Sequence, residues 1–232
     1  MQRTIKDNIT EIKDRIANAA VSVGRDPADI CLIAVSKTRP AEDLDTAASC
    51  GITDVGENKV QEINLKKPDV RSDLKWHFIG HLQTNKVKSI IDKVDVIQSV
   101  DSIHIAEEIN KRASQLGIVK DVLLQVNVAG EPQKFGFSVQ AARDAAAEIS
   151  QRLNNVKIRG LMQIAPYAED PEDVRIYFRQ LRELYEELRQ GSIPDADMLS
   201  MGMSGDFEIA VEEGATHVRV GTAIFGKRDY RK

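Results

Sequence analysis

One lysine in this sequence stands where it could act as a nucleophile. Lys37 follows the apolar run Ile30–Val35, which is rich in strand-forming residues. Strand alternation places Lys37 on the same face as Ile33 and Val35, at the carboxyl end of the strand. Partial burial there disfavours the ammonium form, and a neutral amine attacks an aldehyde to form a Schiff base. A solvated lysine at a strand end is the alternative, and the neighbouring residues must decide between the two.

Arg219 is the second unusual residue. Val218 and Val220 suit the helix-covered side of the last strand, so we expect Arg219 and Gly221 to point inward. An inward guanidinium needs an acceptor, either an internal carboxylate or a ring nitrogen or phosphate of a ligand. The sequence alone leaves both kinds of partner open.

Small residues in two further loops predict an anion site. The segments Ser200–Asp206 and Gly221–Thr222 belong to the last two strand-to-helix connections, where backbone N–H groups and hydroxyls can meet a phosphate. An ordinary helix cap by Ser204 is the alternative, although Phe207 three residues later excludes a reciprocal capping box. The pattern is typical of a phosphate cup.

Other polar residues carry weaker functional hypotheses. His77 and His81 straddle a strand end rather than share a helical face, and no third ligand stands at a suitable spacing, so we expect no metal. His81 can still line the mouth of a site. The long connection Asn127–Gly136 could cover the site, although a solvated loop is the simpler interpretation.

Alternating apolar runs and amphipathic stretches must position these residues. Short apolar runs alternate with helix-like stretches, of which Glu172–Gln190 is the clearest, and this alternation indicates parallel strands joined by crossover helices. Eight such units in 232 residues favour an α/β fold, a single (β/α)8 TIM barrel, over an open doubly wound sheet. An extra N-terminal helix begins near Ile5 and ends at Gly24. The eight runs are Ile30–Val35, Ile52–Val55, Trp76–Ile79, Val94–Val100, Val122–Val128, Ile158–Ile164, Met198–Met203 and Val218–Phe225.

Composition and the lack of several motifs limit the class of protein. The 32 basic and 36 acidic residues give a formal net charge of −4, which argues against a general nucleic-acid binder. Cys31 and Cys50 show no metal-like spacing, and no apolar stretch is long enough for a membrane span, so we expect a reduced, cytoplasmic protein. No GxGxxG motif follows the first strand and no linker divides the chain. We therefore expect one barrel domain over residues 1–232, with no further domain after it.

The same residues occur together in a known family. The sequence resembles the pyridoxal phosphate homeostasis proteins along nearly its whole length, and the matching segments, taken in order, are very specific. These segments are Ala34–Thr38, Gly56–Glu62, Trp76–Lys86, Gly160–Met162, Ser200–Ser204 and Arg219–Gly226.

The resemblance implies a cofactor and a set of contacts. It implies that Lys37 holds pyridoxal 5'-phosphate as a Schiff base, that Arg219 faces the pyridine nitrogen and that Asn58 is a further contact beside the ring. It also implies that the phosphate is held by Ser200, Ser204, Gly221 and Thr222.

The family is similar in fold to the barrel domain of bacterial alanine racemases, which leaves an amino-acid racemase as an alternative. Racemisation usually needs an acid or base on each face of the substrate carbon, and only His81 and Tyr167 are modest candidates. In those racemases a tyrosine from a separate β domain takes this part, and we expect no such domain here. Arg219 beside the ring nitrogen would also weaken the electron sink. A Schiff-base aldolase that uses Lys37 without pyridoxal is a third alternative.

We therefore expect a carrier of pyridoxal 5'-phosphate that acts in vitamin B6 homeostasis without robust catalysis of its own. The expected state is a monomer that binds neither nucleic acid nor membrane. Apo-enzymes that depend on the cofactor are the candidate recipients.

Overall fold

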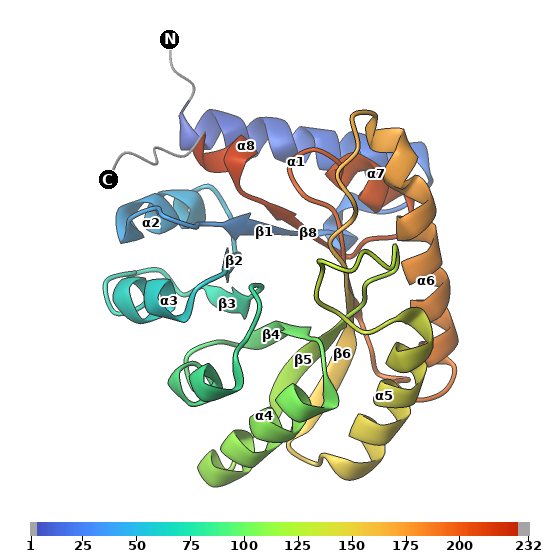
Figure 1. Ribbon diagram of the computed structural model, residues 1–232. Helices are drawn as coiled ribbons and strands as arrows, with labels where there is room; N and C mark the ends of the chain where they lie inside the picture. The colour runs from blue at the N-terminus through green and yellow to red at the C-terminus, as the bar shows by residue number, and fades with distance from the viewer. Residues whose placement is uncertain (1–3, 227–232) are drawn as a thin grey trace.

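Eight parallel strands of the computed structural model, which describes residues 4–226, pair in chain order and close into a barrel (Figure 1). The ring closes where β1 pairs with β8, and this pairing sets Ile33 opposite Arg219. The predicted TIM barrel is confirmed. The strands are β1 (Cys31–Val35), β2 (Asp54–Glu57), β3 (Lys75–Phe78), β4 (Val96–Val100), β5 (Lys120–Gln125), β6 (Val156–Met162), β7 (Met198–Ser200) and β8 (His217–Val220).

Helical segments follow the strands and cover the outside of the barrel. The connection after β3 contains a 3-10 helix, η2 (Thr84–Ser89), in place of an α-helix, and further 3-10 turns are η1 (Pro27–Asp29) and η3 (Pro171–Val174). The α-helices are α1 (Ile5–Ser22), α2 (Ala41–Ser49), α3 (Val60–Lys66), α4 (Ile103–Leu116), α5 (Val139–Arg152), α6 (Arg175–Arg189), α7 (Phe207–Glu212) and α8 (Thr222–Phe225).

The predicted extra helix at the start of the chain is α1, which lies along α7 and α8 (Figure 1). Its apolar face is buried there through Ile9, Ile12, Ile16 and Ala19. The side chains of Thr4 and Asp7 cap its first turn reciprocally, which satisfies backbone N–H groups that have no partner within the helix. The first helix thus closes the outer layer beside the last two units. Within residues 4–226, no helix is long and apolar enough to cross a membrane.

Each of the eight strands differs from its predicted apolar run at one end or at both, and two of the runs show why. The run Val218–Phe225 covers most of β8 and all of the short helix α8, because Ile224 and Phe225 are apolar residues buried on that helix. The run Val122–Val128 is shifted along the chain, since β5 begins at Lys120 and ends at Gln125. Hydrophobicity alone does not separate a buried strand from a buried helical turn.

The barrel interior holds both apolar and polar side chains. Val96, Leu123, Met162 and Met198 form a small apolar cluster of their own. Buried polar side chains from β2, β3, β4, β7 and β8 are hydrogen-bonded to one another, and they are Asp54, His77, Gln98, Ser200 and Arg219. A TIM barrel is a packed core rather than a pore, so these polar groups must find partners inside it.

Candidate functional site

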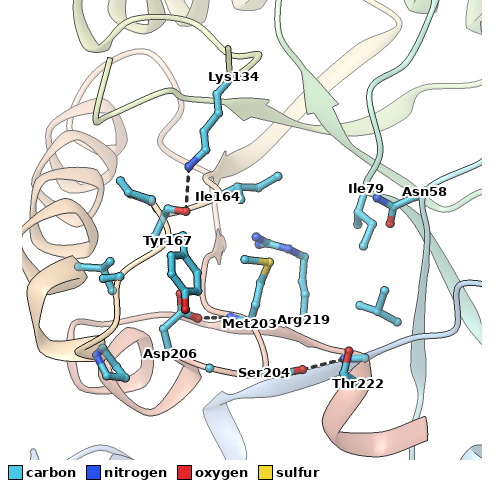
Figure 2. A pocket seen from close by; sticks show the side chains of 18 of the residues that line it. Asn58, Ile79, Lys134, Ile164, Tyr167, Met203, Ser204, Asp206, Arg219 and Thr222 are labelled. Atoms are coloured by element: carbon cyan, nitrogen blue, oxygen red, sulfur yellow. Dashed lines mark hydrogen bonds between the residues drawn. The ribbon is translucent and has the colours of Figure 1, made fainter. Parts of the chain in front are cut away.

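A pocket of about 730 Å³ opens at the carboxyl ends of the strands. It collects six of the seven residues that the sequence assigns to the cofactor, and they are Lys37, Asn58, Ser204, Arg219, Gly221 and Thr222. In Figure 2, Arg219 lies between the side of the pocket that carries Ile164 and the side that carries Ile79 and Asn58. The topology explains this gathering, because β1 and β2 lie on one side of β8 and β7 on the other.

Hydrogen bonds to two glutamates hold the turn that carries Lys37. Ser36 is fully buried, and its hydroxyl donates to Oε1 of Glu57 at 2.6 Å. Thr38 adopts a left-handed conformation with φ 62°, which is uncommon for a residue with a branched side chain. Its backbone N–H donates to Oε2 of Glu62 at 2.6 Å. Hydrogen bonds therefore hold the residues on both sides of Lys37. Lys37 itself is half-buried and lines the pocket.

A buried ion pair supports that turn. Nζ of Lys66 lies 2.6 Å from Oε1 of Glu57 and 2.7 Å from Oε2 of Glu62, and it also donates to the backbone oxygen of Ser36 at 2.7 Å. Both Glu57 and Lys66 are buried. Burial raises the pKa of Glu57 even though Lys66 opposes the shift. The ammonium group of Lys66 thus joins α3, β2 and the Lys37 turn.

Asn58 brings an unsatisfied oxygen to the pocket. Its Oδ1 is buried and has no hydrogen-bond partner. A Cβ added at Gly80 would lie 2.1 Å from the backbone oxygen of Asn58, so only glycine allows the two backbones to approach this closely. A ligand with a suitably placed donor would satisfy the oxygen, because a buried acceptor without a partner costs free energy.

Arg219 is a buried cation that no carboxylate neutralises directly. It is 4% exposed, and its guanidinium donates to Oγ of Ser200 and to the backbone oxygen of Gln163, each at 2.7 Å. Across residues 4–226, no carboxylate oxygen lies within ion-pair distance of it. Burial lowers the pKa of Arg219 to about 10, against the attraction of Asp206, so the group stays charged at neutral pH. An internal ion pair therefore does not explain this arginine.

Three of the four predicted phosphate contacts, Ser204, Gly221 and Thr222, line the pocket together. The backbone N–H groups of Gly221 and Ala223 point at Oγ of Ser204, at 3.3 and 3.5 Å. Figure 2 shows Ser204 and Thr222 together at one end of the pocket. A Cβ at Gly221 would lie 3.0 Å from the backbone oxygen of Val35, which shows how closely this loop approaches β1. The cup therefore lies beside the Lys37 strand.

Ser200 does not belong to this group. Its side chain is fully buried, it does not line the pocket, and its hydroxyl donates to Oε1 of Gln98 at 2.7 Å while accepting from Arg219. The expected phosphate contact of Ser200 does not fit this position, because β7 ends at Ser200 with the side chain turned into the barrel below Arg219.

The connection Asn127–Gly136 is more than a solvated loop. Glu131, Gln133 and Lys134 line the pocket, and Nζ of Lys134 donates to the backbone oxygen of Ala165 at 3.0 Å across it (Figure 2). The sequence analysis did not predict that Ile164 and Met203 line the pocket, whereas Tyr167, one of its two acid-base candidates, does line it. These residues lie on loops, where periodicity carries no information about which side chain faces a cavity.

Neither of the two candidate acid-base residues is buried inside the pocket. His81 is not part of the pocket wall, because its Nδ1 pairs with Asp101 at 2.9 Å and its ring stacks on Phe135. Tyr167 stands on the rim and is 92% exposed. In the part of the chain that the structure describes, no group of three or more His, Cys, Asp or Glu side chains could hold a metal ion.

The closed barrel, with Lys37 after its first strand and Arg219 on its last, belongs to the class of alanine racemase-like barrels. The model of the alanine racemase N-terminal domain matches residues 3–229. Within this class the chain belongs to the pyridoxal phosphate homeostasis protein family. It is 48% identical to the family member from Aquifex aeolicus over 226 residues, covering 97% of this chain and 98% of that protein. It is 38% identical to the member from Escherichia coli K12, covering 98% of both.

Solved structures agree with this placement. PipY from Synechococcus elongatus with PLP bound matches with a TM-score of 0.80 at 38% identity, over 93% of this chain and all of that one. An alanine racemase from Clostridium difficile matches with a TM-score of 0.69 at 15% identity, over 97% of this chain and 58% of that chain. The second likeness shows the shared fold alone.

Proposed function

We propose that this protein binds pyridoxal 5'-phosphate reversibly in the barrel-mouth pocket and serves the cellular homeostasis of that cofactor. The observation that carries the proposal is the convergence of Lys37, after β1, with the buried guanidinium of Arg219 in one cavity. The names of the relatives and the PLP-bound PipY structure support the same cofactor.

Each end of the cofactor has residues that suit it. Lys37 would hold the aldehyde end, because the bound cofactor would supply a carbonyl carbon that condenses reversibly with the amine, with loss of water. The guanidinium of Arg219 retains N–H groups beyond those given to Ser200 and Gln163, and these would donate to the ring nitrogen. Asn58 would be a further contact beside the ring. Ser204, Gly221 and Thr222 would hold the phosphate, and Ser200 would act through Arg219 instead.

The site suits a carrier better than a catalyst. The bound cofactor supplies an electron sink, and a donor such as Arg219 at the ring nitrogen leaves that nitrogen unprotonated and weakens the sink. His81 is held by Asp101 outside the pocket wall, and Tyr167 is exposed at the rim. We expect the purified protein loaded with the cofactor to exchange the α-proton of amino acids no faster than the free cofactor, as followed by NMR in D2O. Exchange at enzymic rates would favour the racemase alternative.

Ser204→Ala should weaken retention of the phosphorylated cofactor. The substitution removes a hydroxyl from the phosphate end, and a hydrogen bond to a charged group contributes about 1.5–3 kcal/mol, which is roughly a tenfold to 150-fold change in Kd. A fluorescence or absorbance titration measures this change. Pyridoxal without phosphate is the matched control ligand, and its affinity should stay the same. An equal loss for both ligands would contradict the phosphate role of Ser204.

We further propose that the protein acts in the cytoplasm, as a monomer, and supplies apo-enzymes that need the cofactor. The free thiols of Cys31 and Cys50 are compatible with a reducing compartment. One chain alone lines a pocket that contains Lys37, Ser204 and Arg219.

A further inference from the structure

One continuous row of hydrogen bonds crosses the barrel interior and ends at Arg219. We call it the interior chain. Its links are Asp54 Oδ1 to His77 Nε2 at 2.7 Å, His77 Nδ1 to Gln98 Nε2 at 2.9 Å, Gln98 Oε1 to Ser200 Oγ at 2.7 Å, and Ser200 Oγ to Arg219 at 2.7 Å. These residues lie on five different strands, so two residues bonded to each other in the interior chain are up to 102 positions apart in the sequence.

The interior chain is closed to solvent along most of its length. His77, Gln98 and Ser200 are 0% exposed, and Asp54 and Arg219 are buried. A buried polar group without a partner costs free energy, so each member depends on its neighbours. The carboxylate of Asp54 also accepts from the hydroxyl of Thr53 at 2.7 Å. Hydrogen bonds from His77 and Thr53 outweigh burial and hold the pKa of Asp54 below its usual range.

Arg219 determines which atom donates and which accepts in every hydrogen bond of the interior chain. A guanidinium only donates, so Oγ of Ser200 accepts from Arg219 and gives its single proton to Oε1 of Gln98. The amide nitrogen of Gln98 then faces Nδ1 of His77, which must accept. The proton of His77 therefore sits on Nε2 and is donated to Asp54.

The nearby imidazole of His217 does not compete for this proton. Its ring centroid lies 6.3 Å from that of His77, and its Nδ1 is bonded to the hydroxyl of Thr216. Burial lowers the pKa of His217 to about 4, so it is neutral at pH 7.

We propose that Asp54, His77 and Gln98 are positioning residues that fix the direction of Arg219 toward the ring nitrogen of the cofactor. This inference rests on the proposed function. The three residues act through Ser200 and do not line the pocket. Asp54 and His77 orient the amide of Gln98, and Gln98 in turn orients Ser200. Without Gln98, Ser200 is free to turn, and the guanidinium loses one of the two contacts that hold it in place.

The first test is the protonation state of His77 in the protein without cofactor. A ¹⁵N–¹H NMR spectrum of the wild type at pH 7 should show Nε2 protonated and Nδ1 unprotonated. In Gln98→Glu, a carboxylate faces both Ser200 and His77, and we expect His77 to become doubly protonated while Ser200 keeps its acceptor. A wild-type signal with the proton on Nδ1 would overturn the derived direction of the chain.

The second test is affinity for pyridoxal 5'-phosphate. Gln98→Leu removes both links and should raise the Kd about tenfold, whereas Gln98→Glu should stay within about threefold of the wild type. Lys120→Met is the matched control, because it removes another buried hydrogen bond, to Val94, that does not belong to the chain. It should leave the affinity unchanged.

The outcomes separate the two proposals. If the wild type binds the cofactor and Gln98→Leu binds it as tightly as Lys120→Met does, the positioning role is overturned and the proposed function stands. If the wild type binds no cofactor, the proposed function itself is overturned, and the positioning role with it. If Gln98→Leu does not fold, Gln98→Glu decides: unchanged affinity with a doubly protonated His77 supports the role, and a tenfold loss overturns it.

Discussion

Replacing Lys37 with alanine should abolish the adduct that borohydride traps between the protein and pyridoxal 5'-phosphate. Reduction turns a Schiff base into a stable secondary amine, so the trapped mass reports covalent attachment at one lysine. Lys37 is the pocket lysine that directly follows an inner strand and is fixed by its neighbours Ser36 and Thr38. Mass spectrometry of the reduced protein measures the adduct, and circular dichroism checks that the barrel is still folded.

Lys134→Ala is the matched control for this experiment. Lys134 lines the same pocket, but it lies on the connection after β5 and is paired with Glu131 and the backbone of Ala165. We expect the control to keep the adduct on Lys37. An adduct of undiminished yield in Lys37→Ala would show that another amine carries the cofactor, and the assignment of Lys37 would be wrong.

The sequence predicted the barrel and most of the pocket because both depend on short-range patterns. Strand alternation placed Lys37 beside Val35, and the valines around Arg219 placed that arginine inside. The order of strands in a TIM barrel then brings the loops after β1, β2, β7 and β8 together without further information. The resemblance to a family added Asn58 and the named phosphate contacts.

The failures have a common physical cause. A residue near the end of a strand can face the ligand or the core, depending on where the strand ends. Here β7 ends at Ser200 itself, and the Ser200 side chain lies in the core. Asp54, His77 and Gln98 are separated by more than twenty positions each, and only the closed barrel reveals that their side chains meet. Lys134 reaches the pocket because its loop folds back onto Ala165, which no periodicity encodes.

The buried pair under the Lys37 turn leads to the second large effect. Lys66→Met removes the cation bonded to Glu57 and leaves a buried carboxylate without compensation. Breaking a buried pair in this way should cost about 3–5 kcal/mol in the free energy of unfolding, as measured by urea denaturation. The double variant Glu57→Gln, Lys66→Met is the control, because it removes both charges, and it should recover most of the loss.

The loss in Lys66→Met should depend on pH in one direction. Burial raises the pKa of Glu57 above its ordinary value of 4.5, so the folded protein binds this proton more tightly than the unfolded chain does. Stability from such a group is present when it is protonated and falls as pH rises from about 4.5 through the raised pKa. Without Lys66 the pKa rises further, and the variant should be closest to the wild type in acid and furthest from it at neutral pH. A deficit that is constant with pH would mean that lost packing, rather than the uncompensated Glu57 carboxylate, causes the destabilisation.

Because Lys66 also bonds to Ser36, the same variant should retain pyridoxal 5'-phosphate less well at neutral pH even where it is still folded.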